Sequence, residues 1–481
     1  MNRHDDGENT TKSILGNSIT SIISIIVSLV TTILITRIIT VSDLGIATSF
    51  ISLKAILSLL CLLSIYISIN KIILDMKGDE YTFLSSIYIF SSIFCIITYI
   101  LYVLFSKYIN ILLGFDFKMM TLMFSLIFLV NGCTIMVNYC NYKNKYKILF
   151  LYNLLASPVA QVLSLIFAWL LTSQKYMGRI IGVEIFNILF GVVSGIYILY
   201  KGHFKINIKY VKKALKICVP MIPHLLSQIV LSSCDLLMIK NIVGNSSAGL
   251  YSMGYTISNI LYTILIQLFM PWSPWVYRRI KNNEIDAIKN NSKIMMIGAW
   301  ILCIGLFTIA PEMIKLFLTE SYYESAFIVA PITVGLFFEV MYIFFYDIEY
   351  YHERNKQIAL FSVVTAIINI ILNYICIKRI GYIAAAYTTL ISYLLLMIMH
   401  YFGMKKVDKR NFYDIKLLGV LSCVLIIVAC LFVISHNNII IRYGTFCFII
   451  IIVFIKYKNI VYSLMNILKQ LIKKRSSHVE S

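Results

Sequence analysis

Long apolar runs dominate this sequence and limit what the chain can fold into. Fourteen runs of about 20 residues follow one another, each long enough to cross about 30 Å of hydrocarbon as an α-helix. Apolar residues make up 60% of the chain and charged residues only 13%, so a water-soluble domain could not hide its apolar surface. We therefore predict an all-α integral membrane protein with about 14 transmembrane helices. The runs lie at residues 14–36, 43–69, 83–105, 119–140, 148–172, 180–200, 217–239, 250–271, 294–318, 326–348, 358–377, 382–402, 415–434 and 439–455.

Lysine and arginine are distributed unevenly between the two sets of loops, and this predicts an orientation. If the N-terminus lies inside, most of the 42 lysine and arginine residues fall in inner loops and tails, as the positive-inside rule expects. The densest group between spans is the basic linker at residues 201–216. We assign the net charge of +20 to membrane topology, not to nucleic-acid binding, and expect both termini in the cytoplasm. Residues 1–12 lead into a span too long for a cleavable signal peptide.

The two halves of the chain repeat each other in outline. Span one ends in a cation, a polar turn and a glycine (Arg37 to Gly45), and span seven ends in a similar way (Lys240 to Gly249). Two six-span repeats of the same orientation predict two pseudo-symmetric lobes around a central cavity. We expect an N-lobe at 1–200, the basic linker at 201–216, a C-lobe at 217–402, and two extra spans with a basic tail at 403–481.

Four stretches combine cations, prolines and glycines at the ends or starts of spans. They are residues 36–45, residues 220–251, the aromatic and proline-rich residues 269–277, and residues 381–389. In this order they resemble bacterial polysaccharide flippases of the multidrug/oligosaccharidyl-lipid/polysaccharide exporter superfamily. The resemblance implies that the protein translocates an undecaprenyl-diphosphate-linked oligosaccharide repeat unit across the cytoplasmic membrane by alternating access. It also implies membrane lipid, glycosyltransferases and a polymerase as partners, with no cofactor and no nucleic acid.

Three cations at or within spans are candidates for binding the substrate. Arg37, Lys54 and Lys240 are expected to attract a diphosphate, lysine as a point charge and arginine as a bidentate fork. The alternative for Arg37 and Lys240 is that they extend to the outer headgroups. Lys54 lies about eleven residues into span two, so about 16 Å deep, where extension to the headgroups is harder.

Three acidic residues are candidates for coupling or for charge pairing: Asp235, Glu184 and Glu339. A charge at mid-depth costs about 2.5–3.5 kcal/mol on insertion scales, so such a group usually has a partner or a wet cavity. Glu339 is expected to be a proton site, a partner of Lys54 across the lobes, or a carboxyl that packs helices together. Asp235 is expected either to take part in transport or to neutralise Lys240.

Other functions fit the sequence less well. Membrane glycosyltransferases and polymerases usually place catalytic residues on a sizeable outer loop, and the outer loops here are short. The sequence has no Walker-type glycine loop for ATP hydrolysis, and its eleven cysteines form no metal-ligand motif. A cation-coupled drug or small-molecule exporter of the same superfamily is the closer alternative. That function would favour acidic residues in the cavity, whereas the mid-span charges here include cations.

Overall fold

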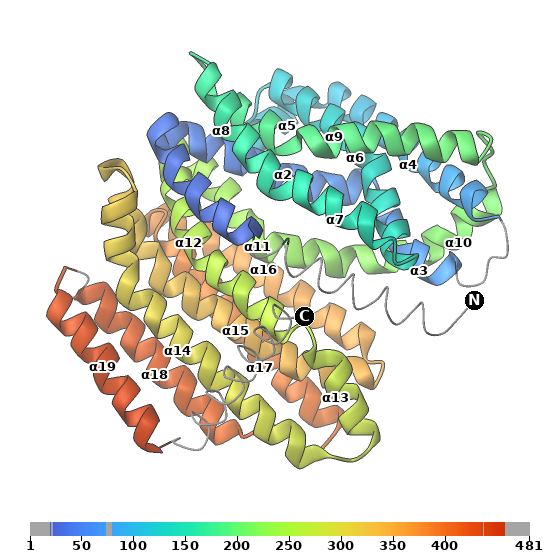
Figure 1. Cartoon of the computed structure of the whole chain (residues 1–481). Coiled ribbons are helices and arrows are strands. Elements are labelled where there is room, and N and C mark those ends of the chain that lie inside the picture. Colours follow the sequence, from blue (N-terminus) through green and yellow to red (C-terminus); the bar gives the residue numbers. More distant parts are fainter. Residues whose placement is uncertain (1–19, 21–22, 74–78, 436, 457–481) are drawn as a thin grey trace, which may run out of the picture. The chain divides into compact units, whose positions relative to one another are not determined.

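The computed structural model describes residue 20 and residues 23–73, 79–435 and 437–456, and all regular structure in these residues is helical. Twelve of the described helices are long and apolar enough to cross a membrane, and Ile23–Ile38 and Ile439–Ile452 are shorter apolar helices. These helices match the fourteen expected spans, which confirms the all-α fold with about 14 membrane helices (Figure 1). Part of the first expected span, 14–36, lies outside the described residues.

The chain divides into two compact units by packing. Three of the boundaries fall inside the helices α12 (Asn245–Phe269), α16 (Asn355–Ile380) and α17 (Ala384–Val407), and the other two enclose the short segment Phe317–Tyr322. Packing units and symmetry lobes are different divisions, so the lobes expected at 1–200 and 217–402 stay a prediction. Unit 1 comprises Met1–Met253, Phe317–Tyr322 and Ala359–Thr388, and unit 2 comprises Gly254–Leu316, Tyr323–Ile358 and Thr389–Ser481.

Unit 1 is built on long helices that bury one side in protein and turn the other side outward. Its core includes Phe50, Met123 and Ile127, while Leu104 and Ile111 are 71% and 78% exposed. Exposed apolar side chains of this kind suit a hydrocarbon surrounding, because lipid carries no penalty for them. The helices are α2 (Val41–Cys61), α3 (Ile69–Ile72), α4 (Glu80–Leu104), α5 (Ser106–Leu113), α6 (Phe117–Tyr142), α7 (Tyr146–Leu154), α8 (Ala160–Leu170), α9 (Lys175–Lys201), α10 (Ile208–Cys218) and α11 (Ile222–Ile242).

The two recurring glycine motifs meet where α2 and α12 begin. A Cβ atom on Gly45 would overlap the carbonyl oxygen of Asn245 and lie 2.8 Å from the nitrogen of Gly249. A Cβ atom on Gly249 would overlap the carbonyl oxygen of Val41. Only glycine lets two helix backbones approach this closely. The motif that the sequence repeats about two hundred residues apart is therefore a packing contact inside unit 1.

The basic linker at 201–216 is helical over its second half. Helix α10 begins after Asn207, whose Oδ1 accepts a hydrogen bond from the backbone nitrogen of Lys209 at 3.0 Å. Val211 and Ala214 are buried, while the lysines of this helix are exposed. The linker thus includes an amphipathic helix with a charged outer face.

Unit 2 is organised around the most deeply buried of its long helices, α15 (Ala326–Tyr351). Helix α19 (Ile439–Lys456) is fixed to α14 (Ile285–Phe317) by Arg442, whose Nη1 donates to Glu312 Oε2 at 2.7 Å. The same nitrogen donates to the carbonyl oxygen of Thr308 at 2.5 Å. The helices α13 (Trp272–Lys281) and α18 (Ile415–Ile434) also lie in unit 2.

Candidate transport site

Lys54 forms a buried ion pair with Glu184 inside unit 1. Its Nζ lies 2.6 Å from Glu184 Oε2, and the two side chains are 11% and 6% exposed. Asn187, one turn along α9, donates to the same carboxylate oxygen at 3.3 Å. Tyr152 of α7 in turn donates to Asn187 Oδ1 at 2.9 Å. The lysine expected at mid-depth therefore has a charged partner, as the cost of burying a lone charge requires.

Both Lys54 and Glu184 were candidates from the sequence, but their contact with each other was not predicted. Counting residues gives the depth of a side chain along a helix and says nothing of the direction in which it points. The alternative that Lys54 pairs with Glu339 stays a prediction, and it would require Lys54 to leave Glu184.

Asp235 is the centre of a second buried network in unit 1. It is 2% exposed, and its two carboxylate oxygens accept hydrogen bonds from Tyr251 Oη and Asn373 Nδ2, each at 2.6 Å. Asn373 also bonds Asn369 Oδ1 at 3.1 Å, and Thr388 Oγ1 donates to Asn373 Oδ1. The network joins α11, α12, α16 and α17 through polar groups, so these four helix segments are held at defined positions within the unit.

Lys240 is the fifth residue after Asp235 on α11, which turns the two side chains about 140° apart around the helix. Its Nζ donates to the carbonyl oxygen of Gly114 and lies 3.3 Å from the centre of the Phe115 ring. This is a cation–π contact. The described contacts of Lys240 are therefore different from those of Asp235. Arg37 is exposed at the end of the helix Ile23–Ile38.

Three buried or half-buried carboxylates of unit 2 lie on α15. Glu339 Oε1 accepts a hydrogen bond from Tyr262 Oη at 2.8 Å. Asp347 accepts from Ser273 Oγ at 2.8 Å and Tyr277 Oη at 3.0 Å. The third, Glu349, contacts a histidine of α17. Sequence reasoning identified only Glu339, although the hydroxyl-bearing residues at 269–277 belong to a stretch that it had marked.

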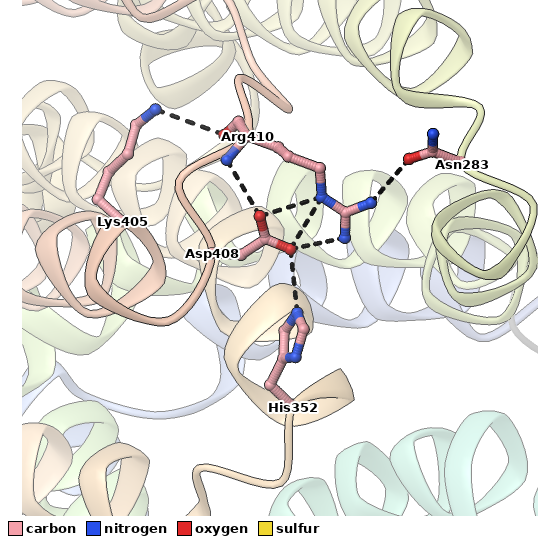
Figure 2. Close-up of polar contacts among 5 residues, drawn as sticks. All are labelled: Asn283, His352, Lys405, Asp408 and Arg410. Atoms are coloured by element: carbon pink, nitrogen blue, oxygen red, sulfur yellow. Dashed lines mark hydrogen bonds and ion pairs between the residues drawn. The ribbon is translucent and has the colours of Figure 1, made fainter.

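A polar cluster joins three loops of unit 2 (Figure 2). Asp408 pairs with Arg410, with Nη2 at 2.6 Å from Oδ2, and the same oxygen lies 3.1 Å from His352 Nε2. Arg410 also donates to Asn283 Oδ1 at 3.0 Å, and Lys405 Nζ reaches the Arg410 carbonyl at 3.5 Å. Burial alone would raise the pKa of Asp408, but the hydrogen bonds from Arg410 outweigh it and lower this pKa to about 2. The cluster ties the ends of α13, α15 and α17 together.

A bundle of about 14 membrane helices with buried charge networks has the architecture of a polytopic membrane transporter. Residues 34–327, more than half of the chain, match the family model of polysaccharide biosynthesis proteins, and the chain belongs to this family. This confirms the resemblance carried by the four sequence stretches. Comparison with curated proteins gives no match.

Solved structures show the same fold. The lipid II flippase MurJ in its inward closed conformation matches with a TM-score of 0.69 at 18% identity, over 92% of this chain and 99% of MurJ. An inward-facing multidrug resistance MATE family transporter of the MOP superfamily matches with a TM-score of 0.57 at 12% identity, over 82% of this chain and 98% of the transporter. At these identities the likeness shows a shared fold.

Proposed function

We propose that the protein is a flippase that moves an undecaprenyl-diphosphate-linked oligosaccharide repeat unit across the cytoplasmic membrane by alternating access. The observation that carries the proposal is that one chain combines membership of the polysaccharide biosynthesis family with the fold of a lipid II flippase. Both point to a lipid-linked saccharide as the cargo. Glycosyltransferases that build the repeat unit and a polymerase that consumes it are the partners that such a flippase needs.

The proposed orientation places both termini and the basic linker in the cytoplasm. The exposed lysines of α10 support it, because lysine-rich segments are retained on the cytoplasmic side. Single cysteines introduced at Lys212 and at Ser246 would test the orientation in intact cells. A membrane-impermeant thiol reagent should label the cysteine at position 246 and not the one at position 212, and the reverse pattern would invert the topology.

Lys54 is proposed to bind the diphosphate together with Arg37 and Lys240. Because Glu184 lies 2.6 Å from Lys54, a diphosphate that reaches Lys54 has to compete with this carboxylate. Two phosphate groups bring more negative charge than one carboxylate, so the competition favours the substrate once it has entered. Substrate entry would then loosen the contact between α2 and α9. Asp235, Glu184 and Glu339 are the proposed charge-pair and coupling residues.

The test is polymer export by a bacterial strain that lacks its own flippase and carries the biosynthetic genes for the matching repeat unit. Lys54→Ala should abolish surface polymer at an unchanged protein level, and Lys54→Arg should retain part of it because the charge persists. Lys143→Ala is the matched control, because Lys143 forms an ion pair with Glu80 that is far more exposed. Normal export by Lys54→Ala would refute the role of Lys54. Drug resistance without polymer export by the unaltered protein would favour the exporter function.

A further inference from the structure

Protonatable side chains follow one face of α15 in unit 2. Glu339, Tyr342, Tyr346 and Glu349 are spaced by three, four and three residues, which places them one above another on an α-helix. We call these four residues the α15 stripe. It covers about 15 Å of helix, from the middle of α15 to a point two residues before its end at Tyr351.

Between Ile328 and Glu349, most of the positions of α15 that are not buried belong to the α15 stripe. All residues from Ile328 to Glu349 are buried except Glu339, Tyr342, Ile343 and Tyr346. Three of these four exceptions belong to the stripe. Glu339, Tyr342 and Tyr346 are thus partly exposed, while Glu349 at the end of the stripe is buried.

Glu349 is paired with His400 of α17 in a site without solvent contact. His400 Nδ1 lies 3.2 Å from Glu349 Oε1, and both side chains are 0% exposed. Gln357 of α16 donates from Nε2 to the other carboxylate oxygen at 3.3 Å. Histidine is a cation only when it is protonated, so the pair is neutral overall only when it holds one proton, on the imidazole or on the carboxyl. Loss of this proton would leave a net negative charge in a closed site, which is costly.

His400 also contacts the two tyrosines of the α15 stripe. The ring of His400 lies 5.3 Å from the ring of Tyr342 and 6.2 Å from that of Tyr346, measured between centroids. Tyr342 is one helical turn from Glu339, whose carboxylate accepts the hydrogen bond from Tyr262. Tyrosine hydroxyls both donate and accept hydrogen bonds, which is the property that a proton path along the stripe requires. Asp347 follows Tyr346 directly and is therefore turned about 100° away from the stripe, and its carboxylate accepts hydrogen bonds from Ser273 and Tyr277 of α13.

We propose that Glu349 and His400 form a proton-binding site, and that the α15 stripe carries the proton between this site and the middle of the helix. Chains of acidic residues and histidine inside membrane proteins serve as proton relays. A proton taken from water binds the pair, and it leaves again as a proton, with no covalent change. The proposal makes the proton the coupling ion of the transport cycle. This coupling rests on the proposed flippase function, whereas proton binding by the pair does not.

The test is charge displacement after a rapid pH jump on the full-length protein reconstituted in a solid-supported membrane, with protons as the only probe. The unaltered protein should give a transient current as protons move into the α15 stripe. Glu349→Gln and His400→Gln should abolish most of the displaced charge, and Glu339→Gln should shorten the path and reduce it. Glu353→Gln is the matched control, because Glu353 is exposed and only four residues from Glu349. Wild-type currents in both pair variants would overturn the proposal.

Infrared spectra and polymer export provide two further tests of the proton site and of its coupling to transport. If the pair variants do not assemble, infrared difference spectra of the unaltered protein between high and low pH should show a carboxyl or imidazole that takes up a proton out of contact with solvent. Absence of both signals overturns the proton site. If Glu349→Gln exports polymer at the normal level although it has lost the charge displacement, proton coupling is refuted and the proposed flippase function still stands. Normal displacement in a protein that exports no polymer supports the proton site and refutes the flippase.

Discussion

Replacement of Lys54 by methionine removes one charge from the buried pair while keeping the length of the side chain. Glu184, which is 6% exposed in the pair, would then keep the amide of Asn187 as its described hydrogen-bond donor. Removing one partner of a buried ion pair typically costs about 3–5 kcal/mol, because the other charge is left uncompensated. Lys54 itself is 11% exposed, so the pair is not completely buried and the lower end of this range applies. We expect a loss of about 3 kcal/mol in the free energy of unfolding.

The double variant Lys54→Met/Glu184→Gln separates the pair from its surroundings. It replaces two charges by two neutral groups, so its cost should fall well below the sum of the two single costs. We expect a coupling energy of about 2 kcal/mol, within the range found for residues in direct contact. The same cycle at the exposed pair of Lys143 and Glu80, which are 35% and 19% exposed, should give about 0–1 kcal/mol.

The assay is equilibrium unfolding of the purified protein by sodium dodecyl sulfate in lipid–detergent micelles, followed by circular dichroism of the helices. Two results would refute the reasoning. One is a Lys54→Met variant that is no less stable than Lys143→Met. The other is additivity of the two single changes within about 0.5 kcal/mol, which would mean that the two charges do not interact.

Two further predictions concern packing and pH. Gly45→Ala should lower the free energy of unfolding by about 1–3 kcal/mol, because the added methyl group overpacks against the start of α12. Gly298→Ala, in open space on α14, should be neutral or stabilising in the same unfolding assay. Equal effects of the two changes would contradict the close backbone contact. Asp408→Asn should cost about 1–2 kcal/mol at neutral pH, because its pKa of about 2 lies below the usual 3.8 and the carboxylate stabilises the fold above about pH 4. That contribution disappears as the pH falls through about 2, so the variant should show a flatter acid dependence, and parallel curves for the two proteins would contradict the prediction.

Most membrane helices could be predicted from the sequence to within several residues, although α14 begins at Ile285, nine residues before the expected span 294–318. The expected spans 326–348 and 415–434 correspond to α15 and to α18, which ends at Ile434. The contrast between apolar runs and charged loops is large enough for this, because each charge at mid-depth is costly. The short helices α5 and α10 were not predicted. Helix α5 has only eight residues, and α10, although its apolar residues recur at helical spacing, lies in the segment that was assigned to the basic linker.

The candidate site was predicted in part. Lys54, Glu184 and Asp235 stand out in a sequence because charges are rare in apolar runs, and the structure gives each of them polar partners. Their partners were missed, since contacts between helices depend on the direction of side chains around each axis. Glu349 and His400 are 51 positions apart and occur singly, so neither forms a motif. The spacing of the α15 stripe is a sequence signal that points to Glu349, and no comparable spacing points to His400.

The ion pair of Lys54 and Glu184 has a consequence for biosynthesis. The two residues are separated by 130 positions, so at about 5–20 residues per second the ribosome makes the carboxylate on the order of ten seconds after the lysine. During this interval α2 carries a positive charge without its final counterion, at a cost of about 2.5–3.5 kcal/mol for full insertion. Helix α2 is therefore expected to stay at the insertion machinery or near the membrane surface until α9 emerges. The order in which the ribosome delivers the helices thus decides when unit 1 can close.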